Sequence, residues 1–188
     1  SVFGDNGNSS ALVNTQLATL QAQHPDATVV VRDLSTDPIP HLDGERVGAF
    51  FTPADQRSED QQAVDAFSMA LIDELKTADH IVLGLPMYNF GIPSQLKSWI
   101  DHVARAGITF RYTENGPQGL LDDKPVTVLA ARGGLYAGTE NDTVTPYIKL
   151  FFGFIGMTDV NFVYAEGLNM GDETKEKAMS EAQAALAG

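Results

Sequence analysis

Residues 80–93 read HIVLGLPMYNFGIP. The first six are rich in Ile, Val and Leu, which is typical of a parallel strand buried on both faces. Pro86 ends that strand, and Pro93 suits the first turn of a helix that we expect to continue over residues 94–106. A buried strand, a short loop and a helix form the repeating unit of a parallel α/β sheet.

The same alternation extends along the rest of the chain. We expect further strands at residues 27–32, 125–130 and 160–165. We expect residues 34–53 to be irregular, residues 109–121 to be rich in aromatic and turn-forming residues, and helices from Ser9 or Ser10 to about His24 and at residues 58–77, 145–156 and 172–186. This order predicts a three-layer α/β sandwich with parallel strands and right-handed crossovers.

Composition limits the class of protein. The chain has 188 residues, of which 43% are apolar, so we expect one domain with one core over residues 1–188. The formal charge of -13 argues against a nucleic-acid partner. The absence of Cys excludes thiol nucleophiles and thiolate metal sites, and it suits a cytoplasmic protein. The apolar stretches fall far short of the roughly 20 residues that span a bilayer, so we expect no membrane partner.

Three loops have compositions suited to ligand binding beyond the carboxyl ends of the strands, where doubly wound sheets bind ligands. Residues 1–10 open the first helix, whose free N–H groups and positive dipole end attract anions. Residues 84–93 form an aromatic ledge that suits a flat heteroaromatic ring. In residues 130–136, paired glycines let a ligand approach the main chain, and Arg132 or the neighbouring N–H groups would face developing negative charge.

Each loop also has a plain structural interpretation: a helix N-cap, a hydrophobic loop packed on the helix layer, and an ordinary turn. Together the anion cradle, the flat ledge and the second donor loop describe a site for flavin mononucleotide (FMN), with its phosphate, ring edge and pyrimidine end. The first loop lacks both the glycine spacing of a dinucleotide fingerprint and the Gly-Lys-Ser/Thr of a P-loop, so a nucleoside triphosphatase is not expected.

Four segments carry a family resemblance: PMYNF at 86–90, ARAGITFRYTENGP at 104–117, RGG at 132–134 and GFIGMTD at 153–159. With them, the chain resembles the bacterial FMN-dependent NADH-azoreductases, also called FMN-dependent NADH:quinone oxidoreductases, over essentially its whole length. The resemblance implies a flavodoxin-like fold and a homodimer with one bound FMN per subunit. It also implies ping-pong turnover, in which NADH or NADPH reduces FMN and a quinone or azo compound then takes two electrons.

The resemblance also implies roles for particular residues. The phosphate loop matches at Ser1, Gly7, Asn8 and Ser9, with Gly7 where family members often have Ser. The loop along the ring matches at Pro86, Met87, Tyr88, Asn89 and Phe90, with the Asn89 backbone beside flavin N5, where hydride arrives. The pyrimidine end matches at Ala131, Arg132, Gly133 and Gly134, with Ala131 where the family often has Ser. Tyr112 and Phe154 match positions that shape the substrate pocket from the partner subunit, and Tyr136 lies at a variable position that would tune substrate choice.

No side chain is predicted to act as a catalytic acid or base, because the flavin supplies the chemistry and the protein orients it. We expect the histidines His24, His41, His80 and His102 to be surface or capping residues, and we expect no metal site. Donors from residues 132–134 should favour flavin reduction. We expect the apolar residues 147–155 to face the sheet on one side and a two-fold partner on the other.

Other interpretations remain open at this point. A flavodoxin-type electron carrier would share the fold, and a pI near 4.5 slightly favours it. A free-flavin reductase would release its reduced flavin, and a structural protein of this fold would bind none.

The start of the sequence raises one further expectation. In the flavodoxin-like order 2-1-3-4-5 the first strand lies inside the sheet, yet Ser1 already belongs to the first loop. We therefore expect a short segment, a Met plus one apolar strand, to precede Ser1.

Overall fold

The computed structural model describes residues 1–187, and its centre is a parallel sheet. Three strands, β1 (Ile81–Pro86), β4 (Val126–Ala131) and β5 (Val160–Ala165), run in the order β1-β4-β5. Ile81 pairs with Val126, which pairs with Val160. Because the strands start level, their carboxyl ends meet at one edge of the sheet. These strands confirm three of the four that the sequence predicts, and two of them are shifted by one residue.

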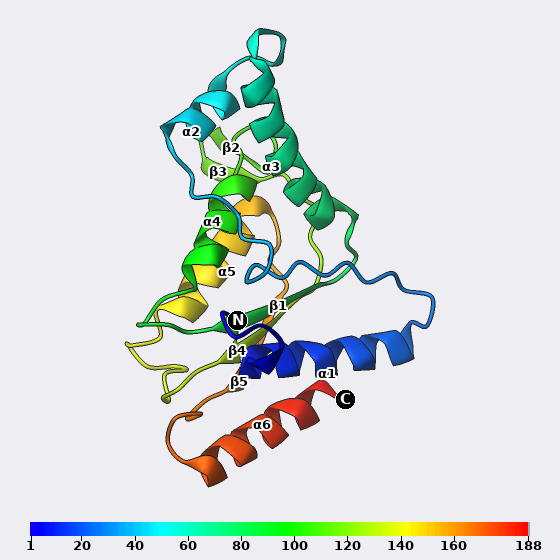
Figure 1. Cartoon of the computed structure of the whole chain (residues 1–188), viewed down its shortest axis with the longest axis vertical. Coiled ribbons are helices and arrows are strands. Elements are labelled where there is room, and N and C mark those ends of the chain that lie inside the picture. Colours follow the sequence, from blue (N-terminus) through cyan, green and yellow to red (C-terminus); the bar gives the residue numbers. More distant parts are fainter. Residues whose placement is uncertain (188) are drawn as a thin grey trace.

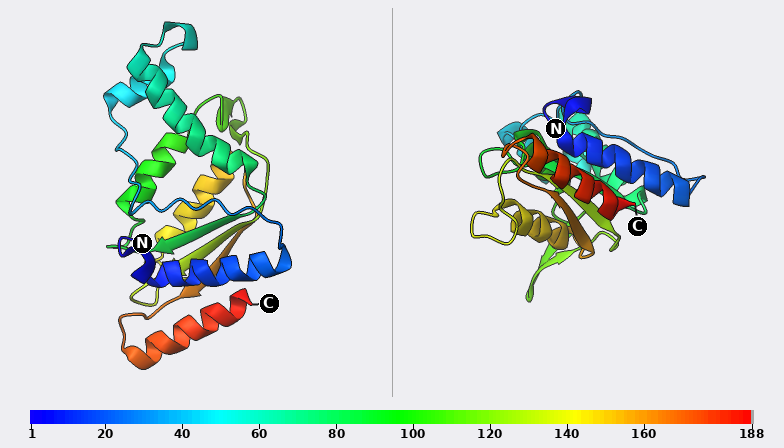
Figure 2. Two further views of the ribbon diagram at one scale, coloured as in Figure 1. Left: turned by 45° about the vertical axis from the view of Figure 1, so that its right-hand side comes forward. Right: turned by 90° about the horizontal axis from the view of Figure 1, so that it is seen from below.

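Helices cover both faces of this sheet (Figure 1; Figure 2). On one face lie α1 (Asn8–Gln23) and α6 (Asp172–Leu186), which share a buried cluster with β4 and β5. On the other face lie α3 (Glu59–Thr77), α4 (Ser94–Val103) and α5 (Val144–Ile155), which form the larger core. The molecule is therefore the predicted three-layer α/β sandwich.

Smaller elements extend from this sandwich. The helix α2 (Gly44–Phe51) packs against α3, and β2 (Phe110–Thr113) pairs antiparallel with β3 (Gly116–Gly119) to form a hairpin. Two short 3-10 turns are η1 (Gly4–Asn6) and η2 (Ala54–Gln56). Among the described residues, no helix is both long and apolar enough to span a membrane.

Local sequence explains where several helices begin and end. Ser58 accepts a hydrogen bond from the Gln61 N–H, and the Gln61 side chain accepts one from the Ser58 N–H, so α3 starts with a capping box. Gly156 ends α5 with φ 114°, a conformation that favours glycine.

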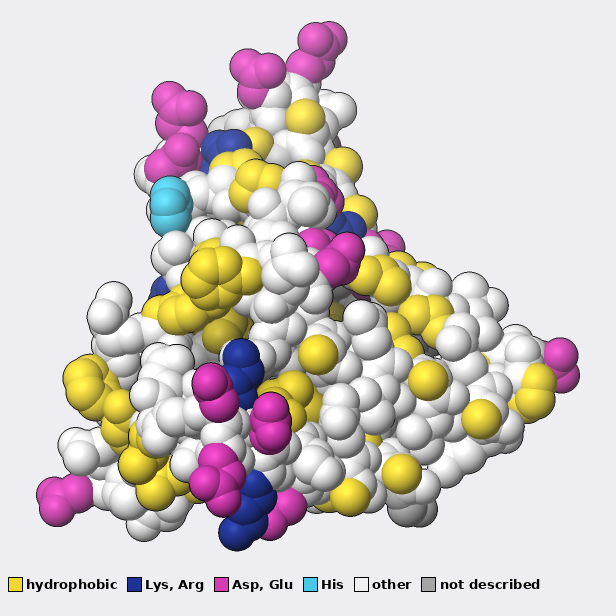
Figure 3. Space-filling view, turned by 60° about the horizontal axis from the view of Figure 1, so that its bottom comes forward, with side chains coloured by type: hydrophobic (Ala, Val, Ile, Leu, Met, Phe, Trp, Pro, Cys, Tyr) yellow, Lys and Arg dark blue, Asp and Glu magenta, His cyan; other side chains and the backbone are white. Residues whose placement is uncertain are grey.

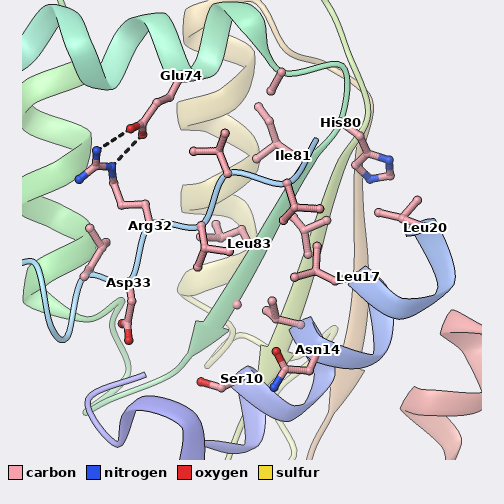
Figure 4. Close-up of a pocket in the computed structure, with 18 of the residues that line it drawn as sticks. Ser10, Asn14, Leu17, Leu20, Arg32, Asp33, Glu74, His80, Ile81 and Leu83 are labelled. Atoms are coloured by element: carbon pink, nitrogen blue, oxygen red, sulfur yellow. Dashed lines mark hydrogen bonds and ion pairs between the residues drawn. The ribbon is translucent and has the colours of Figure 1, made fainter. Parts of the chain in front are cut away.

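The strand predicted at residues 27–32 is wrong. Within residues 1–187 no strand lies beside this segment, and a channel of about 1310 Å³ separates it from the free edge of β1 (Figure 4). Val30 and Val31 are 71% and 72% exposed. The segment is held instead by Arg32, whose Nε donates to Glu74 Oε2 at 2.7 Å. A β-branched run does not become a strand unless a neighbour accepts its hydrogen bonds.

The strand order is confirmed only for part of the sheet. The order β1-β4-β5 corresponds to the 3-4-5 part of the predicted order 2-1-3-4-5, and residues 1–187 supply no strand for the first two places. The strand expected before Ser1 lies outside the described residues and stays a prediction.

The prediction of an irregular segment at residues 34–53 is wrong over α2. Asp43 caps this helix by accepting a hydrogen bond from the Arg46 N–H at 2.9 Å, Ala49 is fully buried, and the helix packs against α3. The cap and the buried contact outweigh the low helix propensity of Gly44 and Gly48.

Candidate flavin site

The first loop leaves hydrogen-bond donors free at the start of α1. Gly7 is the N-cap residue, and no side chain caps the helix. The hydroxyl of Ser9 is buried and has no partner among the described residues. A Cβ on Gly7 would overlap the side chain of Ser1. This helix N-terminus therefore combines unused N–H groups with a spare hydroxyl, as an anion site requires.

The first loop touches the second through Tyr88. Its hydroxyl lies 3.4 Å from Ser1 Oγ and accepts a hydrogen bond from the Val2 N–H at 3.4 Å. The structure thus brings the predicted phosphate loop and ring loop together.

The second loop contains a tight turn at the carboxyl end of β1. Tyr88 and Gly91 each donate a backbone N–H to the other's carbonyl at 2.9 Å. Between them, Asn89 and Phe90 have φ values of 49° and 61°, which is uncommon for residues other than glycine. Both residues are exposed, and their N–H groups have no partner within residues 1–187. Two backbone donors are thus available beside the sheet edge.

The third loop lies beside the second. The Met87 N–H donates to the Ala131 carbonyl at 3.1 Å, and the rings of Phe90 and Tyr136 meet edge to face with centroids 5.7 Å apart. The Asn169 N–H donates to the Gly133 carbonyl at 3.0 Å, and a Cβ on Gly133 would meet Asn169 Nδ2 at 2.5 Å. A side chain at position 133 would therefore displace the Asn169 amide, and the glycine leaves the main chain of this loop open to close approach.

The guanidinium of Arg132 faces the interior of the protein. Arg132 is only 1% exposed, and its Nη2 donates to Asp142 Oδ1 at 2.9 Å and to Thr145 Oγ1 at 2.8 Å. Its Nη1 donates to Glu166 Oε1 at 3.2 Å. Of the two predicted alternatives, Arg132 or the neighbouring N–H groups, the side-chain geometry favours the N–H groups as the ones that would face a ligand. The N–H groups of Gly133 and Gly134 in this loop have no partner within residues 1–187 and are free to donate.

The carboxylates of Asp142 and Glu166 bind the Arg132 guanidinium, and Glu166 also binds the backbone of the loop. Glu166 Oε1 also accepts hydrogen bonds from the N–H groups of Tyr136 and Ala137, each at 2.9 Å. Burial raises the pKa of Asp142, but hydrogen bonds from Arg132 and Thr145 lower it by more, so this pKa lies below its ordinary value. The carboxylate is therefore the stable form of Asp142 in this cluster.

Two predicted pocket residues lie away from these loops within one chain. Phe154 stacks on Phe110 with centroids 4.2 Å apart, and Tyr112 packs on Phe110 at 5.5 Å and is 75% exposed. Phe154 is near the end of α5, whose 12 residues span about 18 Å, whereas the loops lie near its start. The structure therefore does not join Tyr112 and Phe154 to the other site residues within one chain.

The histidines are not part of the three loops. His102 is fully buried, so its prediction as a surface or capping residue is wrong. Its Nδ1 lies 2.9 Å from the Ser98 carbonyl, and its ring packs edge to face against Phe50 and Phe67. His80 Nε2 lies 2.8 Å from Thr127 Oγ1. Across residues 1–187, no group of His, Cys, Asp and Glu side chains has the arrangement of a metal site.

Sequence reasoning missed three residues that support the loops: Asp142, Thr143 and Glu166. Thr143 Oγ1 donates to the Phe90 carbonyl, and the other two bind Arg132. A signal existed for each of them. Asp142 and Thr143 have the composition of a helix N-cap, and Glu166 directly follows a predicted strand.

The fold defines a flavodoxin-like protein, and its three loops meet at the carboxyl edge of the sheet. A family profile described as a flavodoxin-like fold matches residues 1–188. The chain is 81% identical to the FMN-dependent NADH:quinone oxidoreductase of Alcanivorax borkumensis, over 99% of this chain and 94% of that protein. It is 59% identical to FMN-dependent NADH:quinone oxidoreductase 6 of Burkholderia lata, over 95% of this chain and 90% of that protein. The chain belongs to the family of FMN-dependent NADH:quinone oxidoreductases.

Solved structures agree with this assignment. The crystal structure of azoreductase AzrA matches with a TM-score of 0.88 and 30% identity, over 97% of this chain and 91% of that chain. An FMN-dependent NADH-azoreductase from Bacillus anthracis, in complex with FMN, matches with a TM-score of 0.85 and 28% identity, over 96% of this chain and 90% of that chain.

Proposed function

We propose that this protein holds FMN in its three loops and uses NADH to reduce quinones by two electrons, and that it cleaves azo compounds reductively. The observation that carries the proposal is the convergence of unpartnered backbone donors from three loops at one sheet edge. When bound, FMN would accept a hydride from the nicotinamide and pass two electrons to the acceptor.

The residues present fit FMN. The N–H groups at the start of α1, with the hydroxyls of Ser1 and Ser9 and the side chain of Asn8, would hold the phosphate. The backbone of residues 86–90 would lie along the ring. The N–H groups of Gly133 and Gly134 would lie at the pyrimidine end, where donors stabilise negative charge. Binding would therefore depend on backbone N–H groups and neutral side chains, with no Lys or Arg side chain assigned to it.

No side chain is assigned a catalytic proton transfer. The histidines lie outside the loops, and the Arg132 guanidinium is turned inward. The printed names of the relatives favour NADH as the reductant, and NADPH is the alternative to compare with it. Because these nicotinamide coenzymes act inside cells, we propose a cytoplasmic location.

We further propose that the active form is a homodimer. A shallow groove of about 300 Å³ between α4 and α5 is lined by apolar side chains, and Leu150 beside it is 72% exposed. An exposed apolar face of this kind favours a protein partner. The family resemblance implies that a second copy would contribute its Tyr112 and Phe154 to the substrate pocket, and Phe154 lines this groove.

The dimer has a direct test. Leu150→Glu should lower the mass measured by light scattering from that of a dimer to that of a monomer, because it places a charge on the apolar face. Gln183→Glu adds the same charge to an exposed position on α6 and should leave the mass unchanged. A monomeric wild-type chain would contradict the proposal.

Two measurements would distinguish the proposed enzyme from an electron carrier and from a free-flavin reductase. Purified protein mixed with FMN, NADH and a quinone should oxidise NADH rapidly without a separate reductase, which a carrier would not do. In gel filtration the FMN should elute with the protein, whereas a free-flavin reductase would not retain its FMN.

On the face shown in Figure 3, Lys and Arg side chains are scattered among Asp and Glu, so this face offers no continuous basic patch.

A further inference from the structure

Two successive residues before α5 each bind one of the loops at the sheet edge. Asp142 Oδ1 accepts a hydrogen bond from Arg132 Nη2 at 2.9 Å, and Thr143 Oγ1 donates to the Phe90 carbonyl. Asp142 also accepts a hydrogen bond from the Thr145 N–H at 3.0 Å, which fixes it to the first turn of the helix. The start of α5 thus connects the turn at residues 88–91 to the loop at residues 132–137.

The turn at residues 88–91 needs such support. Asn89 and Phe90 both have positive φ, a conformation that side chains disfavour and that persists only where surrounding contacts impose it. Phe90 is 57% exposed, so burial of its side chain contributes little. The two Tyr88–Gly91 backbone hydrogen bonds close the turn, and Phe90 itself contacts the edge of Tyr136 and the hydroxyl of Thr143. The Thr143 bond is the one that fixes the direction of the backbone carbonyl.

The anchor on the other side is rigid. The side chain of Arg132 is fully buried and that of Asp142 is 7% exposed. Glu166 binds the same guanidinium and accepts two further N–H groups of the loop. The position of Asp142, and of Thr143 next to it, is therefore fixed by the loop that would meet the pyrimidine end of the flavin.

We propose that Thr143, anchored by Asp142, is a positioning residue that holds the 88–91 turn at a set distance from the 132–137 loop. The proposal rests on the proposed FMN site, because the 88–91 turn and the 132–137 loop would contact two parts of one flavin ring. Loss of the hydroxyl would release the Phe90 carbonyl, and the Asn89 and Phe90 N–H groups would lose their fixed direction.

The first test uses the flavin-free protein, so its outcome does not depend on the proposed function. Hydrogen exchange at the Gly91 N–H, which donates to the Tyr88 carbonyl, reports whether the turn is held. In Thr143→Val this amide should exchange about five-fold faster than in wild type, which corresponds to the loss of one hydrogen bond. Thr143→Ser keeps the hydroxyl and should restore slow exchange.

A matched control is Thr77→Val. Thr77 also donates its hydroxyl to a carbonyl, that of Asp73 at 2.8 Å, but it lies at the end of α3. This variant should leave exchange at Gly91 unchanged. Unchanged exchange at Gly91 in Thr143→Val would overturn the proposal.

The second test measures FMN affinity by fluorescence titration of the same variants. Thr143→Val should bind FMN about five-fold more weakly, whereas Thr143→Ser and Thr77→Val should match wild type. Faster exchange with unchanged FMN affinity would overturn the positioning role. If the wild-type protein bound no FMN, the proposed function would fail, while the exchange measurement would still decide whether Thr143 holds the turn.

Discussion

Arg132 Nη2 lies 2.9 Å from Asp142 Oδ1, with the guanidinium fully buried. Glu166 lies on the same guanidinium at 3.2 Å, so one buried cation faces two carboxylates. Removing a buried charge leaves its partners uncompensated, which costs far more than the loss of a surface ion pair. The cluster is thus a structural support under the loop at residues 132–137.

This arrangement predicts a large loss of stability in Arg132→Met. The two carboxylates would remain buried without their partner, and we expect the free energy of unfolding to fall by about 3–5 kcal/mol. Urea unfolding of the flavin-free protein measures it. Arg111 is exposed, and among residues 1–187 its side chain hydrogen-bonds Gln118 alone, so Arg111→Met should change stability by less than about 0.5 kcal/mol. Equal losses in the two variants would contradict the role of the buried cluster.

From the lowered pKa of Asp142 we predict that the stability of the folded chain depends on pH in the acidic range. Its pKa in the folded chain lies below the ordinary value of 3.8, so the unfolded chain binds more protons between the two values. The stabilisation is fully present above the ordinary pKa and is lost as the pH falls through the folded pKa. Asp142→Asn should therefore be less stable near neutral pH, and its stability should fall less between about pH 5 and 2. Parallel pH curves for the two proteins would be evidence against this assignment.

His102 predicts a second pH dependence, nearer neutrality. Burial lowers its pKa from 6.5, and Arg46 and Arg105 lower it further, while a hydrogen bond to Ser98 and the charge of Asp101 raise it. The unfolded chain binds the proton more readily, so stability present above pH 6.5 is lost as the pH falls through the folded pKa.

The test for this dependence is His102→Phe, which keeps an aromatic ring between Phe50 and Phe67. Urea midpoints at about pH 7.5 and 5.5 should differ less in this variant than in wild type. His24 is exposed, and His24→Gln should keep the wild-type difference. If His102→Phe kept the full difference as well, another group would be responsible.

Gly119 predicts a steric effect at the base of the hairpin. A Cβ there would overlap the backbone of Ile155 and Gly156, which cannot move aside as a flexible side chain would. Gly119→Ala should cost about 2 kcal/mol in urea unfolding. Gly48 in α2 has nothing within 4 Å of a built Cβ, so Gly48→Ala should instead stabilise the chain by about 0.5–1 kcal/mol. If both variants changed the free energy of unfolding in the same direction, the close packing of the β2–β3 hairpin on α5 would be refuted.

The sheet was predictable where local pattern and tertiary pairing agree. Residues 80–85, 125–130 and 160–165 are apolar runs, and each has a partner strand. Residues 27–32 have the same pattern but no partner strand in the part of the chain that the structure describes, and sequence periodicity does not report whether a neighbouring strand is present. The helix α2 was not predicted, because Gly44 and Gly48 have low helix propensity and outweighed the N-cap signal of Asp43 in the sequence pattern.

The site was predictable as a set of loops but not in its internal geometry. Glycines, aromatic residues and position after strands pointed to the right segments. The positive φ of Phe90 goes against its side-chain preference and depends on Thr143, which is remote in sequence. The inward direction of Arg132 depends on Asp142 and Glu166. Contacts between distant residues decide both features, and no local pattern encodes them.

The central claim is that this chain holds FMN and uses it to carry electrons from NADH to a quinone. Anaerobic stopped-flow mixing of the FMN-loaded protein, first with NADH and then with a quinone, tests it most directly. We predict that the flavin absorbance bleaches on mixing with NADH and returns when the quinone is added, with no other protein present. A flavin that stays oxidised with both NADH and NADPH until a separate reductase is supplied would contradict the account.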